Sequence, residues 1–185
     1  LTTDFSGYRI LCFSYNKRDK KLEDHDIAAH VKPGSGPRHL VFSPNGRYAY
    51  LMNELSGKVI VYSYSDGKLK ELQSIAADNA NARGGADIHV SPDGMFVYAS
   101  TRLKGDGITI FRVGNKGTLT RVGAQLTGKH PRNFAITPNG NFLLVACRDD
   151  NSIEVYSRDK DTGLLKNTHQ DIVLSHPVCV KFYPE

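Results

Sequence analysis

Short apolar runs alternate with turn residues along most of this 185-residue chain. The tetrapeptide SPNG at residues 43–46 recurs as SPDG at 91–94 and as TPNG at 137–140, so the intervals are 48 and 46 residues. Proline presets the backbone angle of the second turn position, and Asn, Asp and Gly tolerate the positions that follow. Each tetrapeptide is therefore expected to close a hairpin between the apolar runs that flank it.

Four apolar runs per repeat predict four short strands. They are rich in Val, Ile, Tyr and Phe, and repeated four-stranded sheets of about this period are typical of β-propeller blades. The prediction is an all-β fold with almost no helix. The expected strands are residues 39–42, 48–53, 58–65 and 68–75 in the first repeat, 88–90, 95–100, 107–113 and 118–126 in the second, and 134–136, 142–147, 152–158 and 164–174 in the third.

The two ends of the chain match only parts of this repeat. The blades are expected at 32–82, 83–128 and 129–174, with 1–31 as the outer strands of a further blade and 175–185 as the inner strand of a closing blade. A closed propeller has roughly 4–8 blades. The chain is therefore interpreted as a partial ring within one propeller domain. The remainder of the propeller, an N-terminal half, is the expected partner, and a half-ring that closes by dimerising is the alternative.

Composition narrows the class of protein. Apolar residues make up 39% and charged residues 23% of the chain, as in globular proteins, and no apolar run reaches the length of a membrane helix. The net charge of +5 suits an anionic ligand, but no block of Lys and Arg points to nucleic acid. Three separated cysteines lie in strand-like runs and are interpreted as core residues. These features indicate a cytoplasmic protein with neither a membrane nor a nucleic-acid partner.

Charged side chains gather at one predicted rim. In an antiparallel pair, the start of the first strand lies beside the end of the second. Arg38 begins such a strand and Glu54 ends the next. Charges at strand ends are often only solvated, which is the interpretation preferred for Arg102 and Arg148. Aligned on the turns, the other rim positions are His39, Asp87, His89 and Arg132.

The stretches GSGPRHLVFSPNGRYAYLMNELSGKVIVY, ADIHVSPDGMFVYAS and HPRNFAITPNGNFLLVA carry a family resemblance over essentially the whole chain. They resemble the lactonase family of seven-bladed propellers, and the match is to the C-terminal half of such a protein. The resemblance implies hydrolysis of a sugar lactone, with 6-phosphogluconolactone to 6-phosphogluconate as the expected reaction, without a metal or other cofactor. The substrate partner is thus a small anionic sugar lactone.

Site residues follow from a His–Arg–Glu–Arg cluster found in the family. By motif, the first Arg falls on Arg38, the Glu on Glu54 and the second Arg on Arg132, while the His belongs to the preceding blade. Arg38 and Arg132 are expected to bind the anionic substrate or the oxyanion, and Glu54 to act as a base or as an acceptor for hydroxyl groups. His39 and His89 are acid–base candidates, because an imidazole titrates near neutral pH. Asp87 and His89 are also expected to contact substrate.

Two other functions stay open. A propeller with charges at its channel mouth can serve as a non-enzymatic binding or scaffold module, and a muconate-type cycloisomerase would use a similar site. No nucleophile elbow, P-loop or dinucleotide motif is present. The polar loop at residues 78–87 could hold a cation, although a connection between blades is the preferred interpretation.

Overall fold

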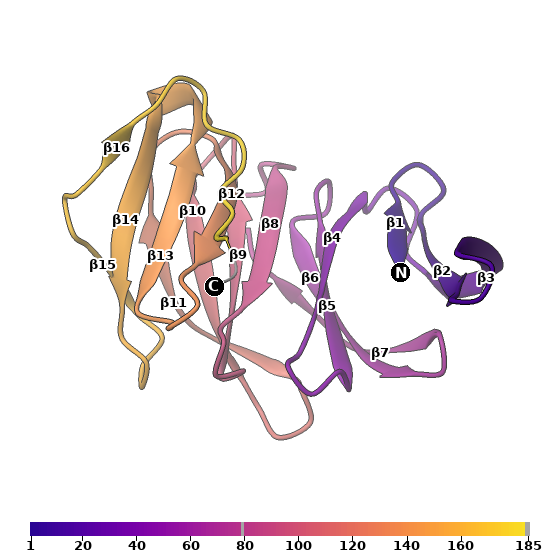
Figure 1. Ribbon diagram of the computed structural model, residues 1–185. Helices are drawn as coiled ribbons and strands as arrows, with labels where there is room; N and C mark the ends of the chain where they lie inside the picture. Colours follow the sequence, from indigo (N-terminus) through magenta and orange to yellow (C-terminus); the bar gives the residue numbers. More distant parts are fainter. Residues whose placement is uncertain (79, 184–185) are drawn as a thin grey trace.

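The computed structural model describes residues 1–78 and 80–183, with the side chains of residues 24 and 25 left out. All sheets in it are antiparallel and follow one another around an arc (Figure 1). The first contains β1 (Thr2–Asp4), β2 (Arg9–Asn16) and β3 (Lys21–His30). The second contains β4 (Pro37–Phe42), β5 (Tyr48–Asn53), β6 (Lys58–Ser65) and β7 (Lys68–Ala76). The third contains β8 (Gly85–Val90), β9 (Phe96–Thr101), β10 (Gly107–Val113) and β11 (Leu119–Leu126). The fourth contains β12 (Pro131–Ile136), β13 (Phe142–Cys147), β14 (Ser152–Arg158), β15 (Leu165–Asn167) and β16 (Ile172–Val173).

The predicted all-β fold of four-stranded antiparallel blades is confirmed. Within the described residues, the one helical segment is the single 3₁₀ turn η1 (Arg148–Asp150). The same part of the chain contains no helix of the length and apolarity that a membrane crossing requires.

The ends of the chain differ in detail from the strands expected there. The three-residue strand β1 was not predicted; it pairs with β2 and lies beside β4. The single run expected at 164–174 is divided into β15 and β16, which both pair with β14. Residues 175–185 were expected to form the inner strand of a closing blade; residues 175–183 form no ladder with other described residues, and residues 184 and 185 lie outside the described part.

The three repeated turns share one hydrogen-bond pattern. The Gly46 N–H donates to the Ser43 carbonyl at 2.9 Å, and the equivalent bonds at 91–94 and 137–140 are both 2.8 Å long. The Asn45 side-chain oxygen accepts from the Ser43 hydroxyl at 2.7 Å, so the turn is also closed by its side chains. This geometry holds the register of the hairpins and keeps the tetrapeptides at the end opposite the charged strand starts.

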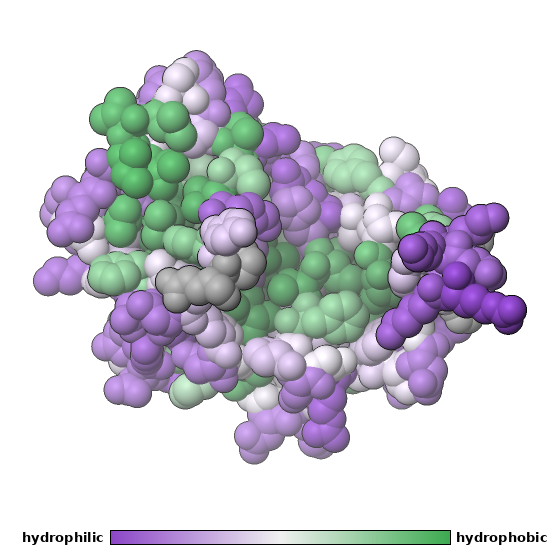
Figure 2. Space-filling view, in the orientation of Figure 1, coloured by the Kyte–Doolittle hydropathy of each residue, from purple (hydrophilic) through white to green (hydrophobic). Residues whose placement is uncertain are grey.

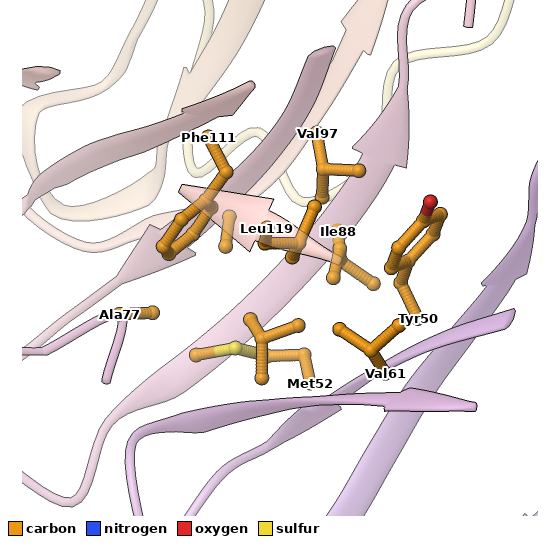
Figure 3. Packing of buried hydrophobic residues seen from close by; sticks show 10 residues of the cluster. Tyr50, Met52, Val61, Ala77, Ile88, Val97, Phe111 and Leu119 are labelled. Carbon is orange, nitrogen blue, oxygen red and sulfur yellow. The ribbon is translucent and has the colours of Figure 1, made fainter. Parts of the chain in front are cut away.

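The central strands of the second and third sheets, β5 and β9, bury both of their faces against neighbouring sheets. Along β5, Ala49 and Leu51 pack toward the first sheet, while Tyr50 and Met52 pack toward the third. Figure 3 shows the second of these interfaces, where Tyr50 and Met52 meet Ile88 and other apolar side chains. The strands β1, β4, β8 and β12 lie side by side in this order at the inner edges of the sheets. The first residues of β4, β8 and β12 are thereby brought to one rim.

Substitution of two glycines with positive φ tests how much the left-handed backbone at turns matters for stability. Gly46 has a φ of 68° with open space at its Cβ position, whereas an added Cβ at Gly163 (φ 77°) would meet the Phe96 ring. In the full-length protein, Gly46→Ala is expected to lower the free energy of unfolding by about 1 kcal/mol through strain alone. Gly163→Ala is expected to cost about 2 kcal/mol or more, because overpacking adds to the strain. Urea titration of both variants would contradict this account if Gly46→Ala were the more damaging.

Candidate functional site

One hollow of about 550 Å³ brings most of the predicted site residues together. Its walls are the inner strands β1, β4, β8 and β12 and residues 178–181. Figure 2 shows apolar surface near the middle of the face that carries these strands, with polar margins around it. The predicted residues that line the hollow are Arg38, His39, Asp87, His89 and Arg132.

Glu54 lies behind Arg38 and is not among the residues that line the hollow. One of its carboxylate oxygens, Oε2, is 3.0 Å from Arg38 Nε, and the other, Oε1, is 3.1 Å from Arg102 Nη2. The juxtaposition of Arg38 and Glu54 follows from the hairpin, since Glu54 N also donates to the Gly36 carbonyl at 2.7 Å. The second guanidinium is Arg102 instead of Arg132, which the sequence placed with Arg38 and Glu54. The carboxylate therefore holds together two cations from neighbouring sheets.

Arg102 is buried, whereas the sequence analysis expected a solvated strand end. Arg102 as a whole is 5% exposed, and its Nε and Nη2 donate to the carbonyls of Gly84 and Gly85 at 3.2 and 3.3 Å. The turn before β8 covers the guanidinium, which a repeat alignment does not reveal. One signal was available: Arg102 aligns with Glu54, and equivalent positions of adjacent blades lie side by side.

His130 extends the series of polar contacts formed by Arg38, Glu54 and Arg102, and the sequence analysis missed it. Its Nε2 lies 3.2 Å from Arg102 Nη1, and its Nδ1 lies 3.2 Å from an Asp149 carboxylate oxygen. Because the guanidinium only donates, Nε2 accepts and the proton of the neutral ring faces Asp149. Burial and the nearby Arg102 lower the pKa of His130, which favours this neutral form. Burial and Arg102 likewise lower the pKa of Arg38, although Glu54 opposes that shift.

Asp87 is the central acceptor in the wall of the hollow. It is 3% exposed and accepts hydrogen bonds from two imidazoles, the Asn133 side chain and the backbone N–H groups of Ile88 and Phe134. Burial alone would raise the pKa of this carboxyl group, but the bonds from His39 and His89 outweigh burial and lower it. Asp87 therefore stays ionised and orients the groups around it.

The two imidazoles bind opposite oxygens of Asp87. His39 Nδ1 lies 2.6 Å from Oδ1, and His89 Nε2 lies 3.1 Å from Oδ2. The His39 side chain is 44% exposed, and Arg38 Nη1 lies 3.3 Å from its Nε2. His89 is more enclosed, with its ring edge-on to Phe134 at 4.8 Å. His39 thus combines a fixed ring with access to the hollow, and it is the better placed of the two to exchange a proton with a ligand.

No group of three or more His, Cys, Asp or Glu residues in the described part of the chain is arranged to hold a metal ion. The loop considered as a cation site, 78–87, includes Asn79, which lies outside the described residues. Cys12 and Cys147 are buried as predicted, but Cys179 is exposed and lines the hollow. The expectation of a core position was wrong for Cys179, because residues 178–181 lie on the wall instead of inside a sheet.

Sequence comparison relates the chain to a known family. The family model described as "Lactonase, 7-bladed beta-propeller" matches residues 1–182. A 6-phosphogluconolactonase from Formosa agariphila is 48% identical over 153 residues, and one from Bacillus subtilis is 35% identical over 179 residues. These matches cover 80% and 92% of this chain but 43% and 50% of the relatives. The chain therefore spans about half the length of the curated relatives it matches.

Solved structures of similar proteins also match this chain over about half of their own length. A Bacteroides uniformis protein, provisionally assigned as a 6-phosphogluconolactonase, has a TM-score of 0.95 and 57% identity, with coverage of 98% of this chain and 53% of that one. A periplasmic gluconolactonase from Pseudomonas aeruginosa has a TM-score of 0.88 and 31% identity, with coverage of 98% and 52%.

Substitution of the buried Arg102 tests whether its ion pair with Glu54 stabilises the fold. Arg102→Ala would leave Glu54 with one cation and would remove the side-chain donors to the carbonyls of Gly84 and Gly85. The free energy of unfolding is expected to fall by about 3 kcal/mol, as for loss of a buried charged partner. Arg148→Ala is the matched control on the same rim; its side chain is 40% exposed, and the expected change is about 0–1 kcal/mol. Equal losses in denaturant titrations of the two variants would show that Arg102 is only a solvated strand end.

The lowered pKa of Asp87 predicts how stability depends on pH. In the unfolded chain an Asp carboxyl group has a pKa of about 3.9. Because the folded pKa of Asp87 is lower, this group contributes its full stabilisation above about pH 4. Asp87→Asn is expected to cost about 3 kcal/mol near neutral pH. The difference between parent and variant should shrink as the pH falls below about 4. The exposed Asp161→Asn serves as control; a cost for Asp87→Asn that grows below this pH would contradict the assignment.

Proposed function

This chain belongs to the lactonase family of seven-bladed β-propellers, and from that premise we propose that it acts in a carboxylic ester hydrolase that opens a sugar lactone. The substrate best supported is 6-phosphogluconolactone, with 6-phosphogluconate as product, because curated relatives at 35–48% identity are 6-phosphogluconolactonases. The observation that carries the proposal is the His39–Asp87 pair beside Arg38 in one hollow.

The proposed reaction uses His39 as the base. Asp87 binds the Nδ1 side of the ring, and Arg38 Nη1 lies 3.3 Å from Nε2. In the proposed reaction a water molecule takes the place of this contact and gives its proton to Nε2 as its oxygen attacks the lactone carbonyl carbon. Arg38 stabilises the oxyanion that develops on the carbonyl oxygen. Its contacts to Glu54 and the Ala86 carbonyl use Nε and Nη1, which leaves Nη2 for the ligand. When the intermediate collapses, the ring C–O bond breaks and the imidazolium returns the proton to the leaving oxygen.

In this scheme Glu54 does not act as the base, which is one of the roles that the sequence analysis expected for it. Both of its oxygens bind guanidinium groups, one from Arg38 and one from Arg102. A carboxylate engaged in this way is poorly placed to receive a proton from water. We therefore assign Glu54 to positioning Arg38, and Arg132 to binding the anionic substrate.

The ring itself is proposed to be completed by further blades. The family is seven-bladed, whereas the described chain contains the sheets from β1 to β16 and spans about half of its curated relatives. The family resemblance places another histidine on the inner strand of the blade before β4, where it would face the same hollow. The assay below therefore uses the full-length protein.

Hydrolysis of 6-phosphogluconolactone by the full-length protein tests the proposal. The parent is expected to accelerate ring opening above the spontaneous rate, and His39→Gln to lower kcat by about a hundredfold or more, as for loss of a general base. His169→Gln, at an exposed position between β15 and β16, is the control and should keep the parent rate. A parent that opens no lactone, or a fully active His39→Gln variant, would overturn the proposed mechanism.

A further inference from the structure

Two cations on the wall of the hollow have no partner within the described part of the chain. Arg132, the second residue of β12, and Lys181 both line the hollow, and the side chain of neither forms a hydrogen bond or ion pair with another described residue. The other charged groups of the wall are engaged: Arg38 binds Glu54, and Asp87 binds two imidazoles. Arg132 and Lys181 are therefore the charges that remain for a ligand.

One hydrogen bond brings these two cations to the same part of the wall. Val180 N donates to the Asn133 side-chain oxygen at 2.6 Å, and the two cations are the sequence neighbours of these residues. The Asn133 amide also donates to Asp87 at 2.5 Å. The same asparagine thus connects the segment that carries Lys181 with the carboxylate that orients His39. The two cations consequently lie close to the acid–base groups.

The charge of the hollow favours a ligand with more than one negative charge. The ionised side chains that line it are one carboxylate, Asp87, and three cations: Arg38, Arg132 and Lys181. A phosphate monoester carries about −1.5 to −2 charges at pH 7. An arginine supplies a planar pair of donors to phosphate oxygens, and a lysine adds a flexible point charge.

We propose that Arg132 and Lys181 form a phosphate-binding subsite that makes the hollow selective for phosphorylated sugar lactones. The inference rests on the lactonase function proposed above. In a sugar δ-lactone phosphorylated on its exocyclic carbon, the ring oxygen joins the carbonyl carbon to the ring carbon that bears the exocyclic group. A carbonyl held at Arg38 and His39 therefore allows the phosphate to extend along the wall toward β12. The substrate class is a sugar lactone that carries a phosphate on the exocyclic carbon.

The test compares 6-phosphogluconolactone with unphosphorylated gluconolactone in the full-length protein. Lys181→Ala and Arg132→Ala are each expected to lower the ratio of kcat/KM for the phosphorylated to the unphosphorylated lactone by about tenfold or more, as for loss of a charge-assisted bond. Lys181→Arg should restore most of the ratio. Lys166→Ala, an exposed lysine on β15 outside the hollow, is the matched control and should leave the ratio unchanged.

Inorganic phosphate provides a second readout that does not depend on turnover of the phosphorylated substrate. It should inhibit hydrolysis of gluconolactone competitively in the parent and about tenfold more weakly in Lys181→Ala. If the parent opens neither lactone, the proposed function fails. If it opens both lactones and the two alanine variants reduce both rates equally, the function stands and the phosphate subsite is wrong.

Discussion

Burial of both faces of the central strands β5 and β9 is the constraint on which the rest of this structure depends. On β5, odd and even positions pack against different neighbouring sheets, so neither set can face water without opening an interface. Since side chains alternate with a period of two, a slip of one residue would exchange the two sets. The register is thereby fixed, and with it the position at which each inner strand begins.

The site is a product of that fixed register. Glu54, at the end of β5, meets Arg38 from its own sheet and Arg102 from the third sheet. Asp87, on β8, meets His39 from β4, His89 from its own strand and Asn133 from β12. Each carboxylate therefore joins side chains that are far apart in sequence, and the charged groups need no dedicated loop or insertion to reach one another.

The sequence was sufficient for the fold because its signals are local and repeated. The turn tetrapeptides and the alternating runs predict the hairpins, and the alignment of repeats predicts that Arg38 and Glu54 share a rim. The partners of Glu54 were harder to predict, since Arg102 is covered by the Gly84–Gly85 backbone and Arg132 turns toward the hollow. His130 lies in a connection before β12, and nothing in its neighbourhood in the sequence indicates that it meets Arg102. Contacts between blades depend on the spacing of sheets, which no single repeat encodes.

The carboxylate of Glu54 spans the gap between two sheets, and this has a consequence for how the protein can evolve. A substitution in the apolar layer between β5 and β8 alters the distance between those sheets, and the same distance determines whether one carboxylate can reach both arginines. Core packing and the rim network are therefore not independent traits. Mutations in the two regions should show epistasis, and a lineage that changes its substrate range at the rim would be expected to carry compensating changes in the layer beneath it.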